Sequence, residues 1–141
     1  MKNKAPLALM EQLVMVLVFA LAAAVCLQVF VMADRLSRSC LERDRAAMEV
    51  QNAAEMLKSR SGDLSACAVM AGDVDEQGRW QLFFDEAWQR SDEEHAVYRV
   101  TASPVETEHE LLGGADVWAE TAGQQELFRI RVSWQKVDAD E

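Results

Sequence analysis

The chain has 141 residues, a formal net charge of −10 and hydrophobic residues at 50% of its length. This length accommodates one membrane segment and one modest domain of about 80 to 100 residues. After Ala33 the chain holds twelve basic and twenty-three acidic residues, a net charge of −11. That acidity argues against nucleic acid or anionic lipid as a partner of this part, because both would be repelled.

An apolar run dominates the N-terminal quarter of the chain. From Leu13 to Ala33 it is interrupted only by Gln28 and the thiol of Cys26. A helix over these positions, at about 1.5 Å rise per residue, spans roughly 30 Å, the thickness of the hydrocarbon core of a bilayer. The composition therefore predicts a membrane-spanning half of an N-terminal helix over residues 7–33.

Glu11 is the one charged residue within positions 7–33. A carboxylate in such a helix is costly in lipid, so by default it marks a function and needs a cation as its partner. A second interpretation places Glu11 among the lipid headgroups, where it complements the positive N-terminus of the helix. Chemistry alone leaves both interpretations open.

Three ordinary targeting signals compete for this segment. A cleaved secretory signal would end at the small-residue site 31–33, but the apolar run is longer than the usual core of about 7–15 residues. A lipoprotein signal would end at Cys26, yet Val25 stands where Gly, Ala or Ser is normally needed. A plain signal anchor needs nothing beyond what is present. None of the three explains Glu11.

Residues 7–21 resemble the N-terminal signal of type IV pilins and of the pseudopilins of type II secretion. In that family a short basic leader precedes an apolar helix whose fifth mature residue is Glu. Residues 1–6, with Lys2 and Lys4, are leader-like. Aligning Glu11 with the family's glutamate makes residue 7 the first mature residue.

The cleavage site is atypical for the family. Pro6 stands where Gly, or sometimes Ala, is expected, and Leu7 stands where Phe is usual. The resemblance implies that Glu11 pairs with the free N-terminal amine of a neighbouring subunit and sets the helix register in a fibre core. If Pro6 prevents cleavage, Leu7 has no free amine, and Lys2 or Lys4 would have to supply the cation.

No helix stop follows residue 33, so the same helix is predicted to continue as an amphipathic half over residues 34–60. Its apolar or small residues recur three and four positions apart, as on one helix face. They are Ala33, Leu36, Cys40, Ala47, Val50, Ala54 and Leu57. The first stop signal is Ser61-Gly62. An Ala-rich stripe of only about three heptads favours packing on a sheet over a coiled-coil stalk.

Residues 61–141 are predicted to form a short helix followed by four strands. Asp63 can cap a helix over 64–71, which Gly72 would close. The apolar period then changes to two, as in strands. The alternating runs are 80–84, 98–102, 115–119 and 128–134. The predicted fold class is α+β, with the long N-terminal helix packed on a small C-terminal antiparallel β-sheet in meander order, which is also the architecture of the pilin-like family.

The sequence carries no catalytic constellation, phosphate loop or nucleophile motif, so no enzyme activity and no cofactor are predicted. The three cysteines and two histidines lack ligand spacing, and no metal site or disulfide is predicted. Residues 73–78 loosely resemble a calcium loop, but an acidic solvated turn is the simpler interpretation. Trp88, in a polar loop, is the better candidate for an exposed contact.

These features and the resemblance predict a structural subunit, a minor pilin or pseudopilin of a type IV pilus-like or type II secretion-like filament. It would be stored in the membrane as a single-pass protein before assembly. Its expected partners are the lipid bilayer and other pilin-like subunits, reached through the N-terminal helix, and not nucleic acid. The charges flanking the helix do not settle orientation, and the C-terminal domain is placed outside the cytoplasm by analogy. The alternative is a monomeric, signal-anchored extracytoplasmic binding domain that does not assemble.

Overall fold

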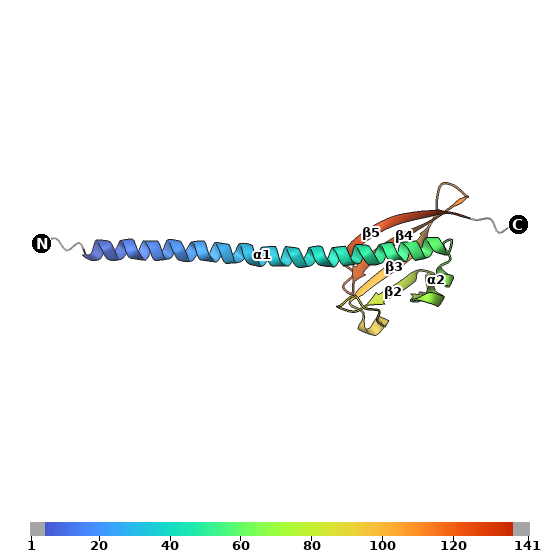
Figure 1. Cartoon of the computed structure of the whole chain (residues 1–141), viewed down its shortest axis with the longest axis horizontal. Coiled ribbons are helices and arrows are strands. Elements are labelled where there is room, and N and C mark those ends of the chain that lie inside the picture. The colour runs from blue at the N-terminus through green and yellow to red at the C-terminus, as the bar shows by residue number, and fades with distance from the viewer. Residues whose placement is uncertain (1–4, 137–141) are drawn as a thin grey trace. The chain divides into compact units, whose positions relative to one another are not determined.

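The computed structural model describes residues 5–136. The chain divides into two compact units, with the boundary between Cys40 and Leu41. One helix, α1 (Ala5–Ser59), contributes to both units (Figure 1). The predicted long N-terminal helix is thus confirmed, and it begins slightly before Leu7. Pro6 lies in its first turn, where a helical N–H would have no partner in any case.

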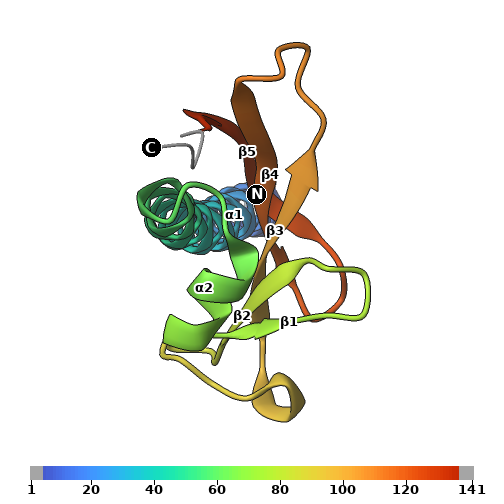
Figure 2. The same ribbon diagram turned by 90° about the vertical axis from the view of Figure 1, so that its right-hand side faces the viewer.

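The second unit adds a short helix and five strands to the end of α1. They are α2 (Leu64–Met70), β1 (Asp73–Val74), β2 (Trp80–Phe84), β3 (Tyr98–Val105), β4 (Leu112–Thr121) and β5 (Glu126–Gln135). A 3-10 turn, η1 (Glu93–His95), lies between β2 and β3. The strands form one sheet in the order β1-β2-β3-β4-β5, and every neighbouring pair is antiparallel. The predicted α+β class and meander order are confirmed, and both helices lie on the same side of the sheet (Figure 2).

The sheet has five strands where the apolar alternation predicted four. The additional strand, β1, contains only Asp73 and Val74, which pair with Gln81 and Trp80. Both residues of β1 are exposed. A strand of two exposed residues has no apolar alternation, so the sequence pattern indicated only a turn at this position.

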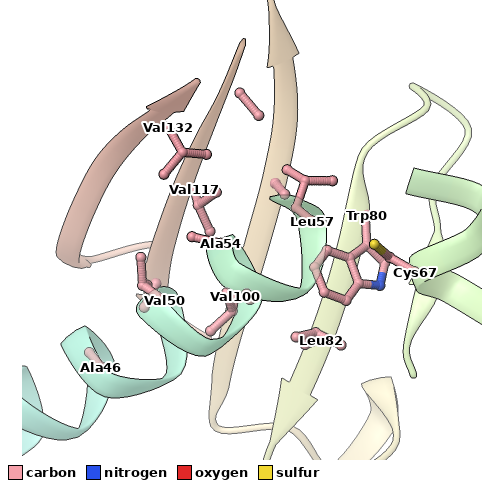
Figure 3. Packing of buried hydrophobic residues seen from close by; sticks show 14 of the residues in the cluster. Ala46, Val50, Ala54, Leu57, Cys67, Trp80, Leu82, Val100, Val117 and Val132 are labelled. Carbon is pink, nitrogen blue, oxygen red and sulfur yellow. The ribbon is translucent and has the colours of Figure 1, made fainter. Parts of the chain in front are cut away.

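The core lies between the last turns of α1 and the inner face of the sheet (Figure 3). The helices contribute Ala46, Val50, Ala53, Ala54, Leu57 and Cys67 to it. The strands contribute Trp80, Leu82, Phe84, Tyr98, Val100, Ala102, Ala115, Val117, Ala119 and Val132. The predicted inward faces of the strands are therefore confirmed. Alanine side chains on the helix and on the sheet leave room for the two layers to pack closely.

The predicted stripe on α1 is wrong at its N-terminal end. Leu36 is 66% exposed and Cys40 is also exposed, whereas the buried stripe begins at Ala46. The first hydrogen bond between α1 and the sheet is at Glu42, whose carboxylate accepts one from the Tyr98 hydroxyl at 3.2 Å. The helical spacing of apolar residues continues on the N-terminal side of Glu42, but the apolar residues there are exposed.

Tyr98 joins the sheet to α1 in an environment that opposes ionisation of its hydroxyl. Burial raises the pKa of Tyr98, and the nearby negative charge of Glu42 raises it further. The hydroxyl therefore stays protonated and donates to the Glu42 carboxylate. This contact joins α1 to the first residue of β3.

The outer face of the sheet carries an array of ion pairs. Asp116 on β4 accepts two hydrogen bonds from Arg131 on β5, at 2.7 and 3.0 Å. The guanidinium of Arg129 lies 3.8 Å from Asp116 and 4.5 Å from the centre of the Trp118 ring. The neighbouring strand supplies the partner of Arg131, whereas Arg129 also pairs with Glu126 of its own strand at 2.7 Å.

We expect the Asp116→Asn variant to lose part of the acid sensitivity of the fold. The hydrogen bond from Arg131, with the charges of Arg131 and Arg129, lowers the pKa of Asp116. A carboxyl with a lowered pKa in the folded state stabilises the fold above its unfolded value of about 4 and loses this contribution as the pH falls through the folded value. The partner arginines are largely exposed, so the cost near neutral pH should be at most about 1 kcal/mol.

Urea unfolding of both proteins near neutral pH and at about pH 3 measures this effect. The difference in unfolding free energy between Asp116→Asn and the unchanged protein should shrink at the lower pH. A difference that stays constant with pH would show that Asp116 does not stabilise the fold through its charge.

Candidate functional site

Residues 7–33 of α1 have an almost wholly apolar surface. Their large apolar side chains, from Leu7 to Met32, are between 44% and 77% exposed. Within residues 5–136, one helix is long and apolar enough to cross a membrane, and its apolar stretch has no buried part. An α-helix pairs its own backbone hydrogen-bonding groups, which is what the hydrocarbon interior of a bilayer requires. The chain thus has one long apolar N-terminal helix that could cross a membrane.

Glu11 lies in the second turn of α1, on this apolar surface. Leu7, Met10, Val14 and Met15 surround its exposed carboxylate in a shallow depression. These neighbours are its helix neighbours at i−4, i−1, i+3 and i+4. Among residues 5–136 no cation forms an ion pair with Glu11. The geometry leaves the carboxylate accessible to a cation on another molecule.

The residues around the expected cleavage site are only partly described. Pro6 and Leu7 are exposed in the first turn of α1. Lys2 and Lys4, the alternative cations for Glu11, lie outside the described residues, as does most of the leader-like segment. Removal of the leader stays a prediction.

Trp88 is packed against the core and is not the exposed contact that the sequence suggested. Its ring stacks on Tyr98, with 4.1 Å between centroids and 9° between planes. A second ring, that of Phe84, lies 5.8 Å away. The backbone of Trp88 has a φ of +57°, which is uncommon for a bulky residue. Asp85 supports this turn by accepting hydrogen bonds from two backbone N–H groups of the loop.

In the acidic turn between β1 and β2, the carboxylate of Asp75 is bound by groups of the same turn. Asp75 accepts hydrogen bonds from the backbone N–H groups of Gln77 and Arg79, both at 2.9 Å, and pairs with the Arg79 guanidinium at 2.7 Å. These contacts, led by the backbone N–H of Arg79, lower the pKa of Asp75. In the described part of the chain, no group of three acidic, histidine or cysteine side chains could hold a metal ion.

The three cysteines occupy different environments. Cys67 is buried in the core, and burial raises the pKa of its thiol, which agrees with its interpretation as a small apolar residue. Cys26 and Cys40 are exposed on α1. All three have free thiols in the structure.

The contact between Glu42 and Tyr98 was missed by sequence reasoning. The two residues are 56 positions apart, and each lies in a segment with an ordinary local pattern. Only the packing of α1 on β3 brings them together, so no local signal could have identified the pair.

Comparison of the chain with models of protein families, with curated proteins and with solved structures found no match. The functional interpretation therefore rests on the residues and geometry described above.

Proposed function

We propose that the chain is a structural subunit of a type IV pilus-like or type II secretion-like filament, in the manner of a minor pilin or pseudopilin. The observation that carries the proposal is α1, a single helix of 55 residues. Residues 7–33 of this helix expose an apolar surface on which Glu11 is the one charged residue. The buried face between Ala46 and Leu57 packs on an antiparallel sheet. Such a helix suits a subunit that is held in lipid first and packed among other helices later.

In this proposal α1 holds the subunit in the membrane as a single-pass segment, and the sheet domain lies outside the cytoplasm. Glu11 pairs with a cation of the neighbouring subunit, and the amine of Leu7 supplies it once the leader is removed after Pro6. Attraction between opposite charges is far stronger in an apolar helix bundle than in water. The pairing therefore favours one register between neighbouring helices over others.

Pro6 favours a second candidate function, because it occupies the position before the expected cut. If the leader stays attached, α1 acts as a plain signal anchor. The sheet domain is then a monomeric binding domain held at the outer face of the membrane. Neither candidate involves catalysis by the chain.

The mature N-terminus separates these candidates. We expect mass spectrometry of the protein purified from membranes to find a chain that begins at Leu7. A chain that retains Met1 would instead support the plain anchor. A chain that begins at Asp34 would be a secreted domain without its apolar helix and would exclude the filament proposal.

A further inference from the structure

The strand β5 forms one edge of the sheet, and part of its backbone has no partner. Its register with β4 is unbroken over residues 128–135. The N–H of Lys136 donates to the Leu111 carbonyl on the β4 side, so even-numbered residues of this segment direct their backbone groups toward β4. The odd-numbered residues direct theirs away from the sheet. These are Arg129, Arg131 and Ser133. Their outward backbone groups make no hydrogen bond within residues 5–136.

The two edges of the sheet differ in how well they are protected against pairing with another strand. At the opposite edge β1 has only two residues, and a very short strand offers little to pair with. The edge strand β5 has ten residues and contains no proline. Its inner-face side chains over residues 128–134 are all apolar, and three of the four are only half-buried. A long row of unpaired donors and acceptors beside half-buried apolar side chains is a template for an added strand.

Charge determines which strand fits this edge. Residues 126–136 carry three basic residues and one acidic residue, a net charge of +2, within a part of the chain that is otherwise strongly acidic. The outward side chains of Arg129 and Arg131 lie along this edge, and that of Arg131 is 67% exposed. A second copy of β5, paired antiparallel and centred on Arg131, would place Arg131 opposite its own counterpart, and like charges opposite each other are destabilising. An acidic strand meets no such repulsion.

We propose that the free edge of β5 binds an extended acidic segment of another protein, which joins the sheet as a sixth strand. Main-chain hydrogen bonds to Arg129, Arg131 and Ser133 hold the segment, and its acidic side chains lie beside the two arginines on the outer face. Its apolar side chains alternate with the acidic ones and extend the apolar row of the inner face. The inference rests on the sheet domain alone and depends on neither membrane insertion nor filament assembly.

Selection of peptides on the full chain in mild detergent tests the proposal. The probe is a library of random decapeptides displayed on phage, and enriched sequences are then synthesised for binding measurements. We expect them to carry acidic residues at alternate positions. Amide hydrogen exchange of the unchanged chain should show the N–H groups of Arg129, Arg131 and Ser133 slowed by about ten-fold or more with peptide bound. The N–H groups of Ile130 and Val132, which already pair with β4, should be protected with and without peptide.

Two substitutions at one position separate the edge from its side chains. Ser133→Pro removes an outward N–H and no hydrogen bond of the sheet, so the chain should fold while peptide affinity falls by about ten-fold or more. Ser133→Ala keeps the N–H and should bind as the unchanged chain does. Arg131→Gln should weaken binding by roughly two- to five-fold.

Several results would overturn the inference. They are no enrichment of peptides, enriched peptides without acidic residues, unchanged exchange of the outward N–H groups, and equal binding to Ser133→Pro. Unfolding of Ser133→Pro would also overturn it, because the N–H of Ser133 would then belong to the sheet. A dimer of the chain that Ser133→Pro abolishes would assign this edge to a second copy instead.

Discussion

Replacing Leu57 by alanine should lower the free energy of unfolding of the sheet domain by about 2–5 kcal/mol. Leu57 is fully buried near the end of α1 and lies in the core with Trp80 and Val117 (Figure 3). Its truncation removes apolar contacts from both layers and leaves a cavity that the surrounding sheet can fill only in part. Few other single changes remove as much of the contact between α1 and the sheet.

Leu41→Ala is the matched control, since it removes the same atoms from the same helix. Leu41 is 63% exposed, so its truncation should change the unfolding free energy by no more than about 0.5 kcal/mol. Urea unfolding of the full chain in mild detergent, followed by tryptophan fluorescence, compares the two variants. Similar losses for both, or no loss for Leu57→Ala, would mean that this face of α1 does not form the core.

The strands were predictable because burial on one face of a sheet imposes a period of two on the sequence. This alternation is seen in two strands, at Val100 and Ala102 and at Val117 and Ala119. All four residues lie in the core, as the alternation predicts. Val50 and Leu57 on α1 likewise show the spacing of one helix face. In these elements the local sequence pattern and the tertiary packing both require apolar residues at the same positions.

Features that depend on a distant partner were not predictable. The buried stripe of α1 starts at Ala46, and nothing in the helix sequence marks that limit. The backbone of Trp88 adopts a left-handed conformation, and its ring stacks on Tyr98, which is distant in sequence. The two-residue strand β1 exists only because β2 provides a partner for it.

At the candidate site the residue could be predicted from the sequence, but its partner could not. Glu11 could be identified from sequence because a single carboxylate in an apolar run needs no fold to be noticed. Its partner could not be identified, since no cation within residues 5–136 pairs with it. In the proposed filament Glu11 receives its partner from another subunit, and the fold of one chain does not determine such a contact.

The second large effect is expected for Glu11→Ala. Removal of the charge should leave membrane insertion of α1 unchanged or improve it, because an apolar helix partitions into lipid more readily. Contact with neighbouring subunits should weaken by about a hundred-fold or more, since breaking a buried ion pair costs about 3–5 kcal/mol. Gln12→Ala, a change at the next residue, is the control and should affect neither property.

The measurement that tests the filament proposal most directly is crosslinking beside Glu11 in native membranes. The exposed thiols are first removed by Cys26→Ala and Cys40→Ser. A thiol introduced by Met15→Cys then lies one turn from Glu11. The proposal predicts crosslinks to neighbouring subunits in the chain that retains Glu11 and their loss in Glu11→Ala. Equal crosslinking in the two chains, or none in either, would contradict it and favour the monomeric anchor.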